Sequence, residues 1–389
     1  MEKSIAALVP CGTYEDQEVI EAVRRGFSLL GGTDTFVARD EKILLKLNLL
    51  GKAHPQRAMT THPAVFRAVA RVLQEEGFPH IAYGDSPGNA APLEVAKSCG
   101  VQQVAEELHI PLSNFEEGKA VPYPQGRAGK SYTICQGVLE ADALINLCKM
   151  KTHALERITG GVKNIYGCVP GFNKKTGHAR HPNAVGFAHM LADLNGLVKP
   201  RLHVMDGVMA MEGNGPSAGT PVNMGVLLFS KDPVALDSVF CHLVHLPPHL
   251  VPTNVAGAEA GLGHYREEEI EVRTPEGVLT MAQVISQYGN AGFQVHRDAL
   301  GKGLPLRVLR LLPALSERPK VDPGKCIRCG ICVESCPVEG KAVFLNKKTD
   351  SVPRYDYRKC IRCYCCQEHC ASFAISVQRP LERFFGKKK

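Results

Sequence analysis

The sequence lacks any run of apolar residues close to the roughly 18 that a membrane-spanning helix needs, so we expect no transmembrane segment. Its amino terminus also lacks a secretory signal, because the early apolar stretch at residues 5–9 is too short for the hydrophobic region of one. We therefore predict a cytoplasmic protein. Its 44% hydrophobic and 22% charged residues exclude a disordered or fibrous chain, and 389 residues suit two or three domains.

Most of the chain also lacks an excess of charge of one sign. Residues 1–320 contain 32 Lys and Arg and 32 Asp and Glu, so the whole formal charge of +7 comes from residues 321–389. A nucleic-acid partner would have to bind that part alone. The same part contains most of the cysteines, whose thiolates would offset several of its positive charges. We therefore expect no nucleic-acid binding.

Cysteine is the exceptional residue of this sequence. The chain has fifteen, an odd number that does not fit the small, disulfide-stabilised secreted class, and nine of them lie between residues 326 and 370. Eight of the nine form two runs with the spacing C-x2-C-x2-C-x3-C, which is typical of bacterial two-cluster ferredoxins. The runs are Cys326, Cys329, Cys332 and Cys336, followed by Cys360, Cys363, Cys366 and Cys370.

In this pattern the fourth cysteine of each run binds the cluster of the other run. We therefore predict two [4Fe-4S] clusters with crossed ligation. One set of ligands would be Cys326, Cys329, Cys332 and Cys370, and the other Cys336, Cys360, Cys363 and Cys366. Structural zinc and disulfides are the competing interpretations, but zinc sites commonly use two C-x2-C pairs, which is a different spacing. Cys365 fits no ligand position, and we expect a packed or exposed free thiol.

Before residue 310, short apolar runs alternate with amphipathic stretches, which is typical of an α/β layered fold. We predict strands at residues 4–9, 43–50, 80–83, 143–147, 202–205 and 224–229, and helices at residues 15–30, 63–76, 93–98, 101–108 and 233–244. The predicted fold class is α/β, with a layered, mostly parallel sheet in the core domain and a small α+β domain of the two-cluster bacterial ferredoxin type. The expected boundaries are 1–303 for the core domain, 304–320 for a linker, 321–378 for the ferredoxin-like domain and 379–389 for a basic tail.

Polar residues gather at or just beyond the ends of the predicted strands. In open α/β sheets, ligands bind outside the carboxyl ends of the strands, so we expect these side chains to share one crevice. They are Lys46, Asn48, His62, Asp85, Lys149, Lys151, His153, Asp206 and Glu212.

A basic segment at residues 149–189 contains eleven Lys, Arg and His residues and a single acid, Glu156. Its interspersed glycines let the backbone approach a ligand closely, and so basic a concave site suits a carboxylate or a phosphate. A solvated charged surface is the alternative, but the segment lacks the alternation of Lys and Glu seen on exposed helices. We predict an anion site that includes Lys163 and Asn164. We interpret His178 and His181 as anion contacts or structural histidines rather than as metal ligands.

Five motifs occur in order along the chain. They are TTHP at residues 60–63, KMKTH at 149–153, TGGVKN at 159–164, DG at 206–207 with EGNGP at 212–216, and DPVALD at 232–237. Together they resemble the bacterial and archaeal domain-of-unknown-function family 362, over about residues 4–378. Members of that family often carry a carboxy-terminal two-cluster ferredoxin domain. The resemblance implies an iron–sulfur protein of α/β fold, common in anaerobes, and it names no substrate.

These observations predict an iron–sulfur oxidoreductase. Electrons from a donor such as a reduced ferredoxin or a reductase would pass through two [4Fe-4S] clusters to an anionic small molecule bound in the α/β core. The substrate-binding residues would be Lys46, Asn48, Lys149, Lys151, Lys163, Asn164 and Glu212. His153 or His62 would supply a proton, and Asp85 or Asp206 would orient it.

Two further points stay open at this stage. A flavin or another organic cofactor could also bind, and the sequence does not decide this. The alternative function is a non-catalytic electron carrier or a docking subunit of a larger redox complex.

Overall fold

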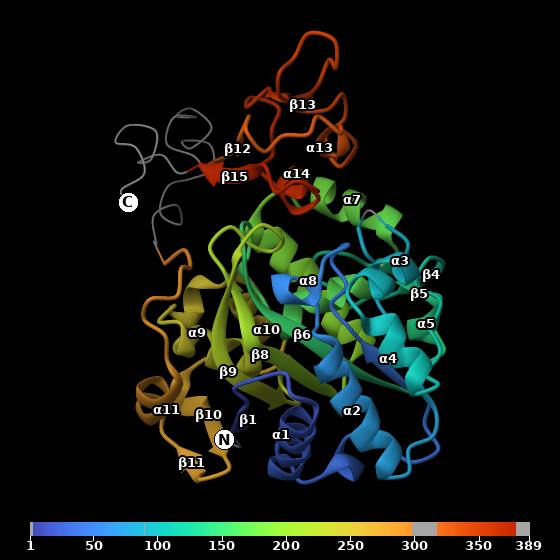
Figure 1. Ribbon diagram of the computed structural model, residues 1–389, viewed down its shortest axis with the longest axis vertical. Coiled ribbons are helices and arrows are strands. Elements are labelled where there is room, and N and C mark those ends of the chain that lie inside the picture. Colours follow the sequence, from blue (N-terminus) through green and yellow to red (C-terminus); the bar gives the residue numbers. More distant parts are fainter. Residues whose placement is uncertain (1–2, 89, 298–316, 379–389) are drawn as a thin grey trace.

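The computed structural model describes residues 3–88, 90–297 and 317–378. The chain forms a core (residues 3–297) and a small lobe (residues 317–378) that sits at one end of the core (Figure 1). Nine strands build the core sheet: β1 (Ser4–Pro10), β2 (Ile43–Lys46), β3 (Ile81–Gly84), β6 (Ala143–His153), β7 (Arg157–Thr159), β8 (Leu202–Glu212), β9 (Thr220–Ser230), β10 (Ile270–Thr274) and β11 (Gly277–Leu279).

The strand order is β11-β10-β1-β9-β8-β6-β2-β3, and β7 pairs with β6. Strands β1, β2, β3, β6, β8 and β10 run in one direction, whereas β7, β9 and β11 run in the other. The predicted α/β class with a mostly parallel sheet is therefore confirmed.

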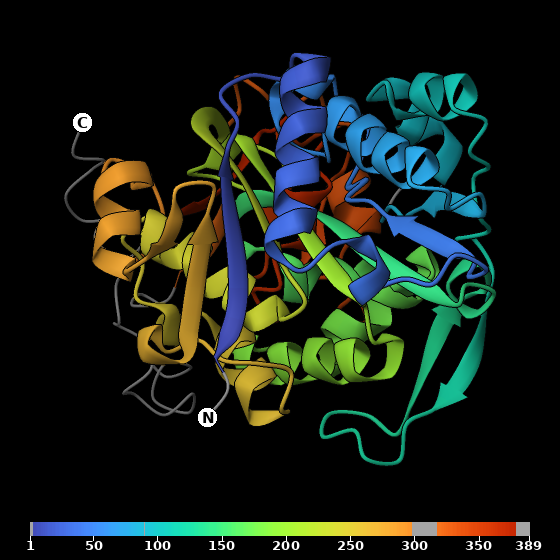
Figure 2. The ribbon, with the colours of Figure 1, turned by 90° about the horizontal axis from the view of Figure 1, so that it is seen from below.

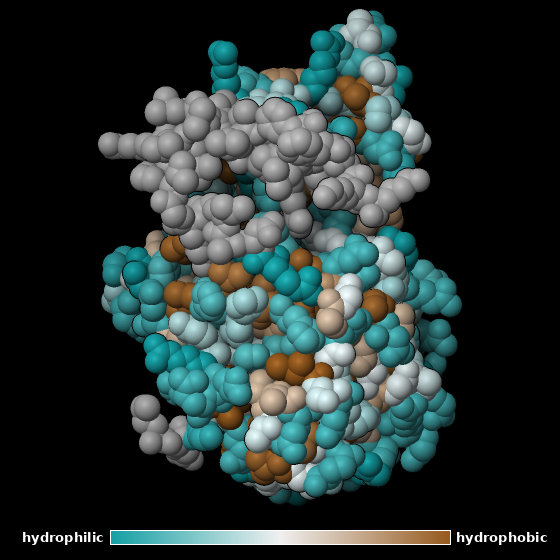
Figure 3. Space-filling view, turned by 90° about the vertical axis from the view of Figure 1, so that its left-hand side faces the viewer, coloured by the Kyte–Doolittle hydropathy of each residue, from teal (hydrophilic) through white to brown (hydrophobic). Residues whose placement is uncertain are grey.

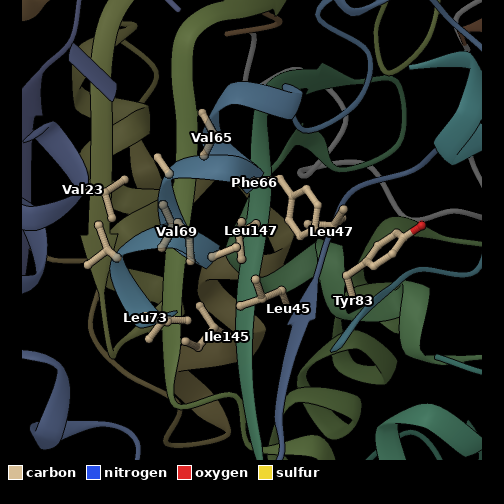
Figure 4. Close-up of a cluster of buried hydrophobic side chains, with 14 of the residues drawn as sticks. Val23, Leu45, Leu47, Val65, Phe66, Val69, Leu73, Tyr83, Ile145 and Leu147 are labelled. Carbon is tan, nitrogen blue, oxygen red and sulfur yellow. The ribbon is translucent and has the colours of Figure 1, made fainter. Parts of the chain in front are cut away.

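Both faces of this sheet are buried. Helices α1 (Asp16–Leu29) and α2 (Pro63–Glu75) cover one face, where Val69 and Leu73 pack against Leu45 and Ile145 (Figure 4). Helices α8 (Ala184–Val198) and α9 (Pro233–Leu243) cover the other face, seen from below in Figure 2. Side chains alternate along each strand, so Leu44 faces α8 while its neighbour Leu45 faces α2.

The other helices and a peripheral hairpin complete the core. The helices are α3 (Pro92–Ser98), α4 (Val101–Glu107), α5 (Gln136–Leu139), α6 (Gly161–Asn164), α7 (Gly171–Arg180), α10 (Pro252–Glu259) and α11 (Met281–Tyr288), and the hairpin joins β4 (Gly118–Pro122) to β5 (Ser131–Cys135).

Three central strands are longer than predicted. The predicted strand at residues 143–147 continues as β6 to His153, and β8 and β9 each extend over eleven residues. The antiparallel pairing of β8 with β9 persists to Glu212 and Thr220, which gives these polar ends ladder partners. The prediction ended β6 too early because it placed Lys149, Lys151 and His153 beyond the strand, and it began β9 four residues too late.

The small lobe consists of short elements. They are β12 (Arg318–Val321), α13 (Ile331–Glu334), β13 (Val343–Phe344), β14 (Arg354–Tyr355), α14 (Cys365–Glu368) and β15 (Ile375–Gln378). Strand β12 pairs with β15 and begins at Arg318, inside the segment predicted as linker. Residues 304–316 of that linker and the predicted tail at 379–389 lie outside the described residues.

Helix α14 and strand β15 attach the small lobe to the loop between β8 and β9. The side chain of Gln367, which is fully buried, donates hydrogen bonds to the carbonyls of Asn214 (2.9 Å) and Gly215 (3.2 Å). In return, the amide of Asn214 donates to the carbonyl of Ile375 at 3.0 Å. The guanidinium of Arg57 lies 4.9 Å from the ring centre of Phe373. The loop that follows β8 therefore positions α14 over the core.

No helix in the described parts of the chain is long and apolar enough to cross a membrane. On the face shown in Figure 3, hydrophobic side chains lie scattered among hydrophilic ones.

The cap of helix α9 yields a test of the fold. Asp232 accepts the backbone N–H groups of Val234 (2.7 Å) and Ala235 (2.9 Å), and also binds Ser4 Oγ and the N–H of His264. We expect Asp232→Ala to lower the free energy of unfolding by roughly 2 kcal/mol or more, because it removes a cap and leaves buried donors unpaired. Urea unfolding followed by circular dichroism measures this. Asp34→Ala, at an exposed carboxylate, is the control, and equal midpoints for the two variants would contradict the assignment.

Candidate functional site

A cavity of about 70 Å³ lies between the core and the small lobe. The core contributes Asn48, Asp85, Ser86, Lys151, Lys163, Asn164, Tyr166, Lys174 and His178 to its lining, and the small lobe contributes Cys365, Glu368 and His369. The sequence placed the anion site in the core alone. The structure instead forms this cavity from both parts of the chain.

A buried ion pair supports the floor of this cavity. Lys46 Nζ lies 2.9 Å from Asp85 Oδ1 and donates to the carbonyls of Leu47 (2.6 Å) and Asn164 (2.9 Å). Gly167 packs directly against the pair, where a Cβ atom would lie 1.9 Å from Asp85 Oδ1 and therefore cannot be accommodated. The charge of Lys46 is fully compensated by Asp85, and Lys46 does not line the cavity. Lys46 is therefore a positioning residue.

A ladder of amides orients the next lysine. Lys151 Nζ donates to Asn48 Oδ1 (2.8 Å) and to the carbonyl of Met59 (2.7 Å). The amide of Asn48 donates to Asn164 Oδ1 (2.9 Å), and that of Asn164 donates to Asn146 Oδ1 (2.7 Å). Predicted residues from three separate segments thus meet at one wall of the cavity.

The environment of Lys151 changes its protonation. Burial and then the positive charge of Lys163 lower its pKa to about 7, while Glu368 partly opposes this effect. Lys163 makes no hydrogen bond or ion pair with any residue that the structure describes, although only 8% of it is exposed. Its ammonium is therefore available to a ligand in the cavity.

Glu368 places a carboxylate among these cations. Its Oε2 atom lies 4.0 Å from Nε2 of His153. Burial opposes ionisation of this carboxyl, but the positive charges around it, beginning with Lys163, outweigh that effect and hold the pKa of Glu368 below its usual range.

His153 has a fixed tautomer. Its Nδ1 atom accepts the backbone N–H groups of Leu155 (3.1 Å) and Glu156 (3.0 Å), so the ring proton lies on Nε2, toward Glu368. Burial lowers the pKa of His153 well below its usual value. Its side chain does not line the cavity, and its role as proton donor stays a prediction.

His178 lines the cavity, although the sequence did not single it out as catalytic. Its ring stacks on Phe187, with 4.3 Å between ring centres, and meets the edge of Tyr166. Its buried Nδ1 atom has no hydrogen-bond partner among the described residues. Burial lowers the pKa of His178 to about 3, so the ring is neutral at physiological pH. Its position in a glycine-rich basic segment was the available sequence signal.

Three of the predicted site residues form a second cluster away from the cavity. Lys149 Nζ lies 2.7 Å from Asp206 Oδ2, which also accepts the backbone N–H of His62 at 3.0 Å. The hydroxyl of Tyr14 donates to Asp206 Oδ1 (2.7 Å), and its ring stacks on His62. These residues do not line the cavity, so the expectation of one shared crevice is wrong for them.

Side-chain alternation places Lys149 and Lys46 on opposite faces of the sheet. Lys149 follows Leu147 on the face covered by α2, whereas Lys46 follows Leu44 on the face covered by α8. Glu212 is also separate from the cavity, because its carboxylate accepts the backbone N–H of Gln294 at 2.7 Å.

The cysteines of the small lobe line two further cavities of about 20 Å³ each. Cys326, Cys329, Cys332 and Cys370 line one, which we call the outer cysteine set, and Cys336, Cys360, Cys363 and Cys366 line the other, the inner cysteine set. These are the two groups that the crossed pattern assigns. None of the fifteen cysteines forms a disulfide bond. Cys365 is a packed thiol that lines the interdomain cavity instead.

The cysteine sets do not resemble a zinc site. Among the described residues, no group of three or more Cys, His, Asp or Glu side chains is arranged to hold a single metal ion. A zinc ion draws its thiolates to about 2.3 Å, whereas a cubane spreads them over several iron atoms.

Comparison with known proteins agrees with both parts of the structure. Residues 43–242 match the family described as domain of unknown function DUF362. The chain belongs to the DUF362 family. Residues 318–371 of this DUF362 protein match a 4Fe-4S dicluster domain. A thylakoid-associated protein from Synechocystis sp. is 36% identical over 263 residues, which cover 67% of this chain and 81% of that protein.

Solved structures are more distant from this DUF362 protein. The lactate racemase apoprotein from Thermoanaerobacterium thermosaccharolyticum has a TM-score of 0.40 and 14% identity over 61% of this chain. A protein from Thermotoga maritima has a TM-score of 0.36 and 14% identity over 64% of this chain. The matches span 56% and 60% of those chains, less than two thirds of either, and they do not bear on function.

The buried ion pair yields a second test. We expect Asp85→Ala to destabilise the protein by about 3–5 kcal/mol, because it leaves the charge of Lys46 buried without a partner. The double variant Lys46→Met with Asp85→Leu should recover most of that loss, since it removes both charges. Urea unfolding of the variants measures the difference. Glu94→Ala, which removes an exposed ion pair with Lys52, should leave the unfolding midpoint nearly unchanged. Similar losses for Asp85→Ala and Glu94→Ala would contradict the buried-pair account.

Proposed function

We propose that this protein binds two [4Fe-4S] clusters and passes electrons through them to a small anion held in the interdomain cavity. Helix α14 carries this proposal, because Cys366 belongs to the inner cysteine set while Cys365 and Glu368 line the cavity. Within a single helical turn, one cysteine of the inner set and two residues of the cavity wall meet. One short helix therefore joins the inner cysteine set to the cavity.

The residues of both cysteine sets fit such clusters. The backbone N–H of Ala342 points at Cys336 Sγ (3.4 Å) and that of Ala374 at Cys370 Sγ (3.2 Å), which is the kind of hydrogen bond that tunes cluster potentials. Apolar side chains such as Val338 and Val343 line the cavity of the inner set. The clusters would supply one-electron transfer.

The lining of the interdomain cavity supports an anionic ligand. Lys163 has an unused ammonium, Lys151 carries a charge below pH of about 7, and Lys174 lies over the ring of Tyr166. A buried water needs roughly 10–15 Å³ by this measure, so a cavity of about 70 Å³ holds about five waters. A ligand of the size of a carboxylate or phosphate group fits this space.

We assign His178 as the hydrogen-bond donor to the bound anion. His178 lines the cavity and its Nδ1 atom has no partner among the described residues, whereas His153 is directed toward Glu368 and His62 stacks on Tyr14. In this assignment the carboxylate of Glu368, near His153, offsets part of the positive charge of the cavity. The side chains of Asn48 and Asn164 orient Lys151 toward the ligand.

Localisation and reaction partners belong to the same proposal. We propose a cytoplasmic redox protein that receives electrons from a protein donor, although its relative from Synechocystis sp. is named thylakoid-associated. A non-catalytic electron carrier is the alternative, and it predicts no small-anion binding.

Iron content tests the cluster assignment. Anaerobically reconstituted protein should contain about eight iron atoms per chain. Cys336→Ser should impair assembly of the inner cluster, and Cys370→Ser should impair assembly of the outer cluster. In each variant, electron paramagnetic resonance of the protein after reduction should show one perturbed signal. Cys365→Ser is the matched control, since we expect it to keep all of the iron. Loss of a cluster in Cys365→Ser, or about four iron atoms in the unaltered chain, would overturn the assignment.

Anion binding tests the cavity. Titration calorimetry of the reconstituted protein with inorganic phosphate and with acetate should detect binding by at least one of the two. Lys163→Gln should weaken it about tenfold or more, because a charge-assisted hydrogen bond is lost. Lys119→Gln, on the exposed hairpin strand β4, should leave it unchanged.

The same titration with acetate, which stays fully ionised from pH 6 to 8, has a pH dependence with a defined sign. Because the pKa of Lys151 is about 7, this lysine is charged below that pH and neutral above it, so acetate binding should weaken as pH rises from 6 to 8. The Lys151→Met variant should bind the anion more weakly at pH 6, and its affinity should no longer fall as pH rises from 6 to 8. Absence of binding at either pH would favour the electron-carrier alternative.

A further inference from the structure

The small lobe exposes a hydrophobic side chain next to its cysteines. Ile327 lies between Cys326 and Cys329 and is 65% exposed, the largest value among the exposed large hydrophobic residues that the structure describes. Phe344 of β13 is also exposed. No other large hydrophobic side chain of the described small lobe is as exposed as these two. Strand β13 lies at the end of the lobe away from the core (Figure 1).

Basic side chains surround Ile327. Lys325, Lys347 and Lys348 are exposed, and the guanidinium of Arg328 donates to the carbonyl of Lys347. This bond joins the loop at residues 345–349 to the loop that carries Cys329. The nearest acid in the sequence, Asp322, accepts the backbone N–H of Gly324 at 3.0 Å. We call Lys325, Ile327, Arg328, Lys347 and Lys348 the basic patch.

The basic patch is adjacent to the outer cysteine set. Cys329 is the one cysteine classed as exposed, whereas Cys363 of the inner set interacts with Cys365 on the wall of the interdomain cavity. The outer cysteine set therefore lies next to the exposed patch, and the inner cysteine set lies next to the cavity. Because electron transfer slows steeply with distance, a donor is most effective at the cluster nearest the surface.

We propose that the basic patch is the docking surface of an acidic one-electron carrier protein, an inference that rests on the proposed function. The patch presents positive charges around a hydrophobic contact, so an acidic partner is attracted over long range and then makes a dry contact beside the outer cluster. Complexes of electron-transfer proteins have small interfaces, so a few charged residues around one hydrophobic side chain can form such a surface. The carrier loses one electron and the outer cluster gains it, with no bond formed or broken.

The test is stopped-flow reduction of the oxidised, reconstituted full chain. The probes are a reduced plant-type [2Fe-2S] ferredoxin, which is an acidic carrier, and dithionite, a small reductant that needs no docking surface. The triple variant Lys325→Glu, Lys347→Glu and Lys348→Glu should lower the rate constant with ferredoxin about tenfold or more, because attraction becomes repulsion. Ile327→Ser should also slow it. The rate with dithionite should stay within about twofold, and added salt should slow only the ferredoxin reaction with the unaltered protein.

A charge-matched control separates this effect from net charge. Lys3→Glu, Lys119→Glu and Arg266→Glu change the total charge by the same amount on exposed positions of the core. Equal ferredoxin rates for the patch and control variants would overturn the docking surface. It is also overturned if the patch variant keeps its ferredoxin rate but loses co-sedimentation with phosphatidylglycerol vesicles, which would make the patch a membrane contact.

Failure of the proposed function gives a different result. An unaltered chain that lacks iron, or whose clusters dithionite does not reduce, overturns the cluster assignment itself. Intact clusters in all variants, with equal ferredoxin rates, overturn the docking surface alone.

Discussion

The hydrogen bonds from Gln367 to the carbonyls of Asn214 and Gly215 join the two parts of the molecule, and the candidate site depends on them. They are made inside the protein, where a donor or acceptor without a partner is costly. They hold α14 where Glu368 and Cys365 line the cavity. The loop between two long antiparallel strands therefore decides where the cysteine-rich lobe meets the core.

Charge is distributed unequally around this junction. Lys46 has Asp85 and Lys149 has Asp206, so both lysines are neutralised within the core. Among the described residues Lys163 has no such partner, and the nearby carboxylate comes from the small lobe, as Glu368. The core thus contributes an excess of positive charge that only the second part of the chain, or a bound anion, can balance. This imbalance is the physical basis for interpreting the cavity as an anion site.

Much of this arrangement could be predicted from local sequence. The cysteine spacing identified the two groups that line the small cavities, and the proline in the first turn of α2 marked the start of that helix. The alternation of side chains along β2 and β6 also contained the information that Lys46 and Lys149 face opposite sides of the sheet. The expectation of one shared crevice did not take this alternation into account. The contributions of Cys365 and Glu368 to the cavity could not be predicted, because they depend on how two separately patterned segments pack.

Helix α14 has a further consequence for how this segment can change. Its four residues have four different neighbours: Cys365 the cavity, Cys366 the inner cysteine set, Gln367 the core loop, and Glu368 the side chain of His153. Each position on a helix is rotated by about 100° from the one before. Insertion or deletion of one residue here would turn all four side chains away from their neighbours at once. Related chains that keep the same arrangement should therefore hold the length of this turn constant.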